Sequence, residues 1–420
     1  MKLAEIIEKY IPGDWGNEVP GNENPYQVSC IRGADIVPIE NVDYSEIPYR
    51  YISERSYNTR LLSVGDIIIE KSGGSPTQST GRVSIVTEDL LKERQNIVCS
   101  NFCEAFRVKS SWNPWYVYYY FRFIYDQGVF FNFEGKTSGL KNLQMDNAFS
   151  SIEIEEFDRS IQDKVANAIL DLDTKITINH QINRKLEAMA KQLYDYWFIQ
   201  FDFPDANGRP YKTSGGKMVW NETLKREIPE GWEDKSLSEL SDNEMCSIMP
   251  SSEPDKVFKH FSIPAYDACG FYEEELGKNI LSNKNVVTEH DVLVSKLNPW
   301  TSRVIWGIDD PDAICSTEYV SLRPKSSDEK AYMFMIAKSL PFMKYCTEAS
   351  TGTSHSHRRV NPDILRMYKV PYSRNCVKAF CDMTEEFFNR ITINKTAEKE
   401  LREQRDFILP LLMTGQVSIG

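Results

Sequence analysis

Apolar residues recur every three or four positions over two long stretches of the chain, and this spacing predicts two long helices. In the first stretch the apolar stripe includes Ile161, Val165, Ile169 and Leu172 and continues as far as Trp197. Charged residues fall mostly between the stripe positions, and neither glycine nor proline interrupts them. This pattern is typical of helices that pair as a coiled coil.

The second stretch runs from about Cys376 to Leu412 and carries a weaker stripe. Polar Thr384 and Glu398 stand where the spacing expects apolar residues. A helix of about 40 residues is roughly 60 Å long, which is more than the core of a domain of about 150 residues needs. The two helices therefore indicate a spacer between globular domains.

The tetrapeptide ITIN occurs in both predicted helices, at Ile176–Asn179 and at Ile391–Asn394. Each asparagine stands three residues after an isoleucine of the stripe. A single polar residue on a coiled-coil seam costs stability but fixes register and orientation. We predict that Asn179 and Asn394 set the helix register. The alternative is that both face solvent on ordinary amphipathic helices.

The rest of the chain contains short β-rich segments that occur twice in the same order. GDIIIEK (Gly65–Lys71) matches HDVLVSK (His290–Lys296), since both are β-branched strands opened by Asp and closed by Lys. IVCSNFCEAFRVKS (Ile97–Ser110) likewise matches AICSTEYVSLRPKS (Ala313–Ser326). Order and spacing agree as well as residues, so we predict an internal duplication.

These patterns predict an α/β (α+β) protein with two globular domains separated by two long helices. The helices are expected to pair antiparallel as a coiled-coil spacer, with the two halves of the chain in pseudo-twofold relation. The predicted boundaries are 1–155 for the first domain, 156–200 for the first helix, 201–228 for a linker, 229–374 for the second domain and 375–420 for the second helix and tail.

Composition limits the class of protein. The chain has 420 residues, so two or more domains are expected. None of its apolar runs approaches the ~18 residues that span a membrane. Its nine cysteines lack the spacing of a metal site or a CxxC motif. This cysteine pattern indicates buried, reduced thiols and a cytoplasmic protein. The net charge of −12 argues against a uniformly basic DNA-binding surface but leaves room for local basic loops. The aromatic run Trp112–Tyr125 is expected in the core, although a base-stacking platform stays open.

Polar loops at matching places in the two halves are the candidate nucleic-acid contacts. Arg and Lys can bond guanine edges, and Asn and Gln can pair with adenine. The alternative for each loop is a solvated turn. The candidate DNA-binding residues are Gln78, Arg82, Lys136, Lys141 and Asn142 in the first domain, and Lys296, Asn298, Arg303, Thr353, Ser354, His355, His357, Arg358 and Arg359 in the second.

Enzymatic motifs are incomplete. GKTS at Gly135–Ser138 resembles the end of a P-loop, but the upstream glycine is replaced by Phe130. Asp66, Glu70 and Lys71 suggest a nuclease carboxylate cluster, yet the second copy has Ser295 where Glu70 stands. The chain also lacks the Asn-Pro-Pro-aromatic and Asp-Pro-Pro-Tyr motifs of amino-methyltransferases.

A metal site is not expected either. His355 and His357 lack a cysteine or carboxylate at ligand spacing. The sequence therefore predicts a chain that is not itself an enzyme and that holds neither metal nor cofactor.

Several segments resemble one known family. FSIPAYDACGFYEEELGKNI followed by DVLVSKLNPWTSRVIW is similar to the second target-recognition domain of type I restriction–modification specificity subunits. LEAMAKQLYDYWFIQFDFP, IPEGWEDKSLSEL, LREQRDFILPLLMTGQV and IRGADI also resemble parts of that family. The resemblance covers nearly the whole chain, in the family's order.

The resemblance implies a non-catalytic subunit whose two domains each read one part of a bipartite site in double-stranded DNA. It further implies that the paired helices set the distance between the parts and dock two DNA methyltransferase subunits, which bind S-adenosylmethionine. Translocase–endonuclease subunits using ATP and Mg²⁺ complete such an assembly. The alternative from another class is a coiled-coil scaffold that binds proteins and not DNA.

Overall fold

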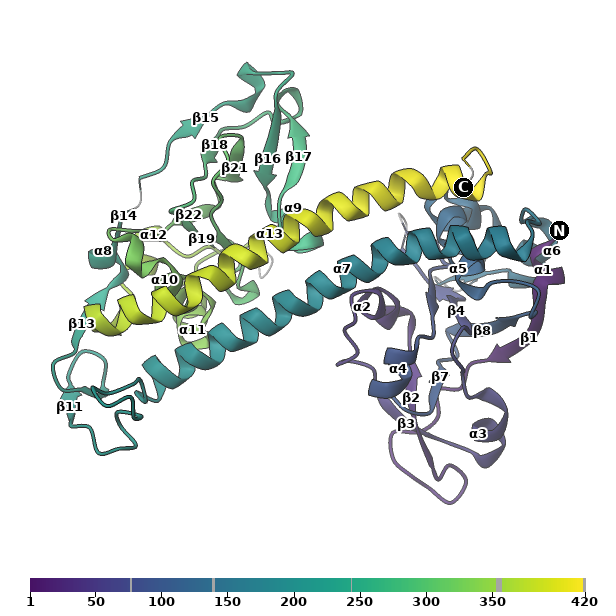
Figure 1. Ribbon diagram of the computed structural model, residues 1–420, viewed down its shortest axis with the longest axis horizontal. Coiled ribbons are helices and arrows are strands. Elements are labelled where there is room, and N and C mark those ends of the chain that lie inside the picture. Colours follow the sequence, from purple (N-terminus) through teal and green to yellow (C-terminus); the bar gives the residue numbers. More distant parts are fainter. Residues whose placement is uncertain (76–77, 138–139, 243, 353–356, 418–420) are drawn as a thin grey trace. The chain divides into compact units, whose positions relative to one another are not determined.

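The computed structural model describes residues 1–75, 78–137, 140–242, 244–352 and 357–417, with the backbone alone at 136, 137 and 140. The chain divides into two compact units, one made of Met1–Gln181 with Ala397–Gly420 and the other of Ile182–Thr396. Each contains an α/β domain and part of both long helices (Figure 1). The division cuts through both helices, so the predicted domain boundaries stay a prediction. In the described part of the chain, no helix is both long enough and apolar enough to cross a membrane.

The first unit contains three small sheets, with strand orders β1-β8-β4-β6, β3-β2-β7 and β5-β10-β9. Its strands are β1 (Ile7–Pro12), β2 (Tyr26–Ile31), β3 (Tyr49–Ile52), β4 (Ile67–Glu70), β5 (Ser72–Gly73), β6 (Val83–Ile85), β7 (Ile97–Cys99), β8 (Cys103–Val108), β9 (Glu134–Thr137) and β10 (Leu140–Leu143). Its short helices are α1 (Leu3–Ile6), α2 (Ile36–Glu40), α3 (Glu54–Arg60), α4 (Glu88–Glu93), α5 (Pro114–Asp126) and α6 (Met145–Ser151).

The aromatic run forms α5, the central helix of the first unit. The helix begins where the side chain of Asn113 accepts hydrogen bonds from the first backbone N–H groups and Pro114 occupies the first turn. Tyr116, Tyr119 and Phe121 are fully buried and pack among the apolar residues of this unit's largest core cluster. The prediction that this run lies in the core is confirmed.

The second unit contains sheets with strand orders β20-β19-β22 and β15-β18-β21-β16-β17, together with three two-stranded pairs, β11-β12, β13-β24 and β14-β23. Its strands are β11 (Met218–Asn221), β12 (Arg226–Pro229), β13 (Glu233–Ser236), β14 (Ser241–Asp242), β15 (Ser247–Ile248), β16 (Val257–Phe261), β17 (Glu273–Leu276), β18 (Lys284–Val286), β19 (Val292–Ser295), β20 (Val304–Trp306), β21 (Ala313–Ser316), β22 (Tyr319–Ser321), β23 (Arg323–Pro324) and β24 (Lys369–Tyr372). Its short helices are α8 (Leu237–Leu240), α9 (Ile263–Cys269), α10 (Lys330–Lys338), α11 (Leu340–Glu348) and α12 (Pro362–Arg366).

The two units repeat the same strand pairings, which confirms the predicted duplication. In the first unit β2 pairs parallel with β7 and antiparallel with β3. In the second, β16 pairs parallel with β21 and antiparallel with β17. The strand triplet β6-β4-β8 is matched in the same way by β20-β19-β22.

A buried aspartate with an arginine partner is also duplicated. Asp66 just before β4 and Asp291 just before β19 are both 0% exposed. Arg107 donates to Asp66 from Nε at 2.7 Å, and Arg323 donates to Asp291 from Nε at 3.0 Å. The aspartate that opens each repeated strand in the sequence is therefore a structural anchor, which binds Arg107 of β8 in the first unit and Arg323 of β23 in the second.

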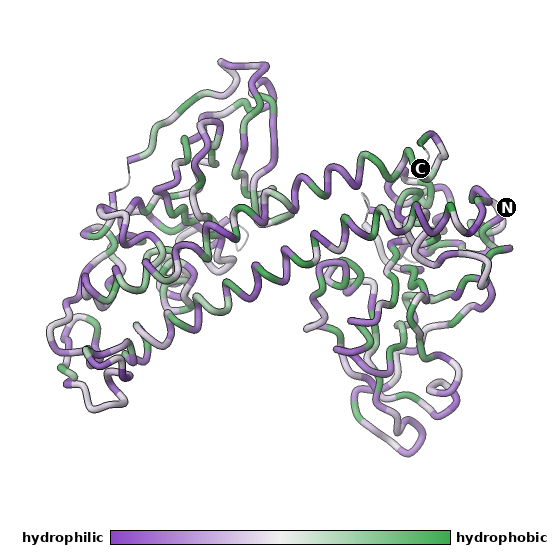
Figure 2. The backbone as a smooth tube through the Cα atoms, in the orientation of Figure 1, coloured by the Kyte–Doolittle hydropathy of each residue, from purple (hydrophilic) through white to green (hydrophobic). Residues whose placement is uncertain are grey.

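The two long helices are α7 (Arg159–Tyr194), which continues into a π-helical turn at Asp195–Ile199, and α13 (Arg374–Met413). Figure 2 shows hydrophilic and hydrophobic residues alternating along both. The fold class predicted from the sequence, two α/β domains combined with two long amphipathic helices, is confirmed.

Within each unit the two helices run antiparallel. In the first unit, Asp173 of α7 bonds Arg405 of α13 at 2.9 Å, whereas Phe157, just before α7, lies against Gly415, just after α13. In the second unit, Asn183 bonds Asn394 at 2.8 Å. Further along α7, the ring of Tyr194 lies 6.3 Å from that of Phe380 near the start of α13.

Candidate nucleic-acid interface

The candidate loops of the first unit fall in two polar segments, Lys71–Arg82 and Glu134–Gln144, whose described parts lie side by side. Strand β5 pairs with β10, placing Lys141 opposite Gly73 and Asn142 opposite Ser72. The Ser72 hydroxyl donates to the Asn142 side-chain oxygen. Segments that are about 70 residues apart in the chain therefore form one small β-surface, as a composite binding site requires.

Lys141 connects this surface to the neighbouring loop. Its ammonium group lies 3.2 Å from the backbone oxygen of Gln78 and 3.0 Å from a carboxylate oxygen of Glu134. The side chain of Gln78 is exposed. Lys136 stands opposite Lys141 in the β9–β10 pair. Gln78, Lys136, Lys141 and Asn142 are thus gathered around one hairpin.

Arg82 is half-buried and bound to a buried carboxylate. Its guanidinium donates two hydrogen bonds to Glu70, at 2.8 Å from Nε and 2.7 Å from Nη2, and the Glu70 side chain is 4% exposed. This hydrogen bonding raises the pKa of Arg82. Gly33 and Gly73 leave room for the carboxylate, because a Cβ at either position would lie 2.6 Å from Glu70 Oε1. The geometry favours Arg82 as a brace for the loop, and its contact with DNA stays a prediction.

The nuclease alternative depends on carboxylates that meet at one point. Here Asp66 binds Arg107, Glu70 binds Arg82 and Lys71 binds Glu104 at 3.1 Å. Each charge is therefore neutralised by a different partner, which is the pattern of a structural ion-pair network.

The candidate loops of the second unit fall in two polar segments, Lys296–Arg303 and Ser350–Asn361, whose described parts also meet. The backbone N–H of Asn298 donates to Arg358 O at 2.8 Å, and the backbone N–H of Arg358 donates to the side chain of Asn298 at 3.1 Å. Val360 N–H donates to Lys296 O at 3.0 Å. Asn298 has a φ of 48°, a left-handed conformation that asparagine tolerates better than most residues. The side chain of Asn298 is thereby used to join the loops.

The arginines of this surface differ in how firmly they are held. Arg303 is 9% exposed and makes two hydrogen bonds to Asp267, at 2.6 and 2.8 Å. Arg359 has a 46% exposed side chain and pairs with Glu318 at 3.0 Å. An exposed pair of this kind contributes about 0–1 kcal/mol, so Arg359 can exchange Glu318 for another hydrogen-bond acceptor at little cost.

Arg358 uses one N–H group on the backbone oxygen of Ser350, at 2.6 Å. His357 next to it is exposed. Thr353, Ser354 and His355 lie outside the described residues. The structure thus brings Lys296, Asn298, Arg303, His357, Arg358 and Arg359 into one neighbourhood, while leaving their contacts with DNA untested.

Asn394 is buried on the helix seam, and its partner was not foreseen. The side chain is 3% exposed and donates from Nδ2 to Oδ1 of Asn183, which is 6% exposed. Asn179, the residue singled out in the first helix, is half-buried. The solvent-facing alternative is therefore wrong for Asn394. Asn183 lies one helical turn after Asn179, and the stripe alone did not mark it.

Replacing Asn394 with alanine is expected to lower the free energy of unfolding by about 1–3 kcal/mol, because the buried amide of Asn183 loses this hydrogen bond. Replacing both Asn183 and Asn394 with leucine should cost less than the single change, since two apolar side chains then face each other. Chemical denaturation measures both. Asn179→Ala is the matched control, and an equal loss in Asn179→Ala and Asn394→Ala would contradict the assignment.

Sequence reasoning also missed a group of three side chains in the second unit, namely His260, Glu273 and Glu275. Burial lowers the pKa of His260, which favours the neutral imidazole at physiological pH. The alternation of Glu273 and Glu275 along a strand was a signal that could have placed two carboxylates on one face. The sequence could not show that His260 lies on the neighbouring strand, opposite Glu273.

Taken together, a duplicated α/β module with a composite polar loop surface in each copy, and a pair of antiparallel helices, defines a class of tandem recognition proteins. Known proteins of this class were found by comparison. A scan against protein-family models gave no match. The chain is 22% identical over 439 residues to the type I restriction enzyme MjaIX specificity subunit of Methanocaldococcus jannaschii, covering 97% of this chain and 95% of that protein. It is 21% identical over 325 residues to the HindI specificity subunit of Haemophilus influenzae, covering 64% and 70%.

The fold agrees with these sequence relatives. The crystal structure of the S subunit of a type I restriction–modification system from M. genitalium matches with a TM-score of 0.60 at 13% identity, covering 98% of this chain and 95% of that one. The resemblance inferred from the sequence is confirmed: the chain is similar to type I specificity subunits over nearly its whole length.

Proposed function

We propose that this chain is the DNA-specificity subunit of a type I restriction–modification complex and is not itself a catalyst. The observation that carries the proposal is the duplicated module, in which each copy joins two separate polar segments into one loop surface. Two copies of one reader suit a site made of two parts. The relatives named above support the choice of DNA over protein as the ligand.

The long helices fit a spacing role in this proposal. Two half-sites one helical turn apart are ~34 Å from each other, and a flexible linker cannot hold such a distance to within one base pair. Paired helices can, because packing and the buried Asn183–Asn394 bond fix their register. In our proposal each module reads one half of a bipartite sequence, and the helices set the number of base pairs between the halves.

The partners follow from the same proposal. The net charge of −12 means that this chain alone offers a modest electrostatic grip on DNA. We propose that two DNA methyltransferase subunits carrying S-adenosylmethionine dock on the helices and share that grip in the cytoplasm. Translocase–endonuclease subunits using ATP and Mg²⁺ would complete the restriction activity.

A binding experiment separates this function from a protein-binding scaffold. The full chain is mixed with duplex DNA of random sequence at low salt, with and without a methyltransferase partner, and retained DNA is quantified and sequenced. Retention of a split sequence motif by the mixture with the partner supports the proposal. Failure of both mixtures to retain DNA favours the scaffold.

Arg358→Ala is expected to weaken or relax reading of one half-site while the other half is read as before. A good side-chain contact to a base edge contributes about 1–3 kcal/mol of discrimination, which corresponds to roughly 5–150-fold in affinity. Sequencing of the sites methylated by the assembled complex measures both halves at once.

Arg209→Ala is the matched control, because Arg209 is an exposed arginine of the linker paired with Asp205, and it should leave both halves unchanged. A uniform loss of affinity over all sequences in Arg358→Ala would identify a phosphate contact and make the prediction of base reading wrong.

A further inference from the structure

His260, Glu273 and Glu275 lie together on one face of the β16–β17 strand pair in the second unit. In the antiparallel register His260 stands opposite Glu273, and Glu275 stands opposite Phe258. Side chains two apart on a strand point to the same face, and opposite side chains are neighbours. The imidazole and both carboxylates are therefore gathered by the strand pairing itself.

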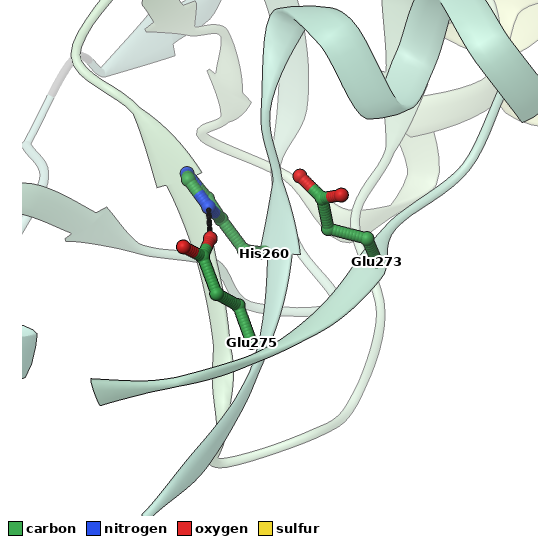
Figure 3. A group of neighbouring side chains, drawn as sticks. All are labelled: His260, Glu273 and Glu275. Atoms are coloured by element: carbon green, nitrogen blue, oxygen red, sulfur yellow. Dashed lines mark hydrogen bonds and ion pairs between the residues drawn. The ribbon is translucent and has the colours of Figure 1, made fainter. Parts of the chain in front are cut away.

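The geometry of the group is compact (Figure 3). His260 Nδ1 lies 2.9 Å from Glu275 Oε2, and Ser262 donates to Glu273 Oε1 at 2.8 Å. One nitrogen or oxygen atom from each of the three residues lies within 4.8 Å of the others. Zn²⁺ binds imidazole nitrogen and carboxylate oxygen at about 2.0–2.2 Å, so small side-chain rotations bring all three atoms to bonding distance of one ion.

The hydrogen bonds of the protein leave this group incomplete. The side chain of His260 is 8% exposed, yet its Nε2 is buried with no hydrogen-bond partner among the described residues. Because Nδ1 faces Glu275, Nε2 points away from that carboxylate, so Nδ1 is the nitrogen that an ion shared by all three residues would bind. The Glu273 side chain is exposed, which gives an ion a route in from solvent.

The fold does not require these residues, because the first unit builds the same strands without them. The pairing of β2 with β7 and of β16 with β21 places Cys30 where His260 stands. The pairing of β2 with β3 places Arg50 where Glu275 stands. Cys30 is fully buried in an apolar cluster. The imidazole and carboxylates are thus a property of the second module alone.

We propose that His260, Glu273 and Glu275 bind one divalent cation of the Zn²⁺ type, with water completing the coordination. One nitrogen and two carboxylate oxygens suit Zn²⁺, whereas Mg²⁺ and Ca²⁺ prefer oxygen ligands throughout. The ion ties β17, the edge strand of its five-stranded sheet, to β16. It would therefore stabilise the outer edge of this sheet in the second unit.

Equilibrium dialysis of the metal-stripped full chain against Zn²⁺, read by elemental analysis, tests the site. We expect one bound equivalent and a rise in melting temperature on adding Zn²⁺, because an ion that binds the folded state stabilises it. The double variant Glu273→Gln with Glu275→Gln should lose both effects. Glu274→Gln is the matched control, since Glu274 lies between the two in the same strand, opposite Lys259, and should keep both.

Three outcomes would overturn the proposal. The first is that the unaltered chain binds no equivalent of Zn²⁺. The second is that the double variant binds as the Glu274→Gln control does, which places the ion elsewhere. The third is that Mg²⁺ competes for the site as well as Zn²⁺, which contradicts ligation by His260. DNA binding is not measured, so the result does not depend on the proposed function.

Discussion

Replacing Asp291 with alanine is expected to lower the free energy of unfolding of the second unit by about 3–5 kcal/mol. The side chain is 0% exposed, and its carboxylate accepts hydrogen bonds from Thr288 N at 2.8 Å, Ser321 Oγ at 2.6 Å and Arg323 Nε at 3.0 Å. The change removes the acceptor of all three donors at once. Buried polar groups then lose their partners, and Arg323 loses its counter-charge.

Chemical denaturation combined with hydrogen exchange measures this effect and locates it. Asp309→Ala is the matched control, because Asp309 is exposed and surface changes usually stay within about 0.5 kcal/mol. Asp66→Ala should have the same effect in the first unit, with exchange protection lost in β4 and kept in β19. If Asp291→Ala unfolds no more easily than Asp309→Ala, the duplicated aspartate is not an anchor.

The duplicated aspartate also shows what the sequence can provide. The residue that opens GDIIIEK and HDVLVSK was visible because a strand, its polar opening residue and its closing lysine are neighbours in the chain. The long helices were predicted for the same reason, since a period of 3.6 residues is a local signal. Features set by local spacing, and features repeated twice, could thus be predicted.

Features that depend on which segments of the chain face each other could not be predicted from the sequence. The partner of Asn394 is Asn183, and that choice depends on the register between two helices far apart in the chain. Arg82 donates two hydrogen bonds to Glu70, and Arg303 donates two to Asp267. Both pairs likewise depend on tertiary contacts. Sequence spacing marked Arg82 and Arg303 as polar loop residues but could not show that a carboxylate already occupies each guanidinium.

The candidate loops could be predicted in part. Their corresponding places in the two halves followed from the duplication, because repeated modules have matching loops. Their pairing did not: the join between Asn298 and Arg358, and that between Ser72 and Asn142, bring together segments with no sequence periodicity in common. The candidate loops of each module could be predicted, whereas their joining into one surface and the orientation of each side chain in it could not.

Inserting one heptad into α7 and one into α13, both beside the Asn183–Asn394 pair, is expected to lengthen the proposed bipartite site without changing either half-sequence. Seven residues add about 10 Å to a helix at 1.5 Å per residue, which corresponds to roughly three base pairs at 3.4 Å each. The apolar stripe keeps its phase because the insertion is a whole heptad. Sequencing the sites methylated by the assembled complex gives the half-sequences and the spacer together.

Two control insertions test whether the effect requires both helices to be lengthened together. Seven residues inserted between 206 and 209, in the turn where Asn207 and Gly208 lie outside the helices, should leave the spacer unchanged, because that loop carries no register. A heptad inserted into α7 alone shifts its seam against α13 and removes the Asn183–Asn394 bond, so it should abolish assembly. If the paired insertion altered both half-sequences, base reading would depend on the helices themselves, and their proposed role as a spacer between two independent readers would be wrong.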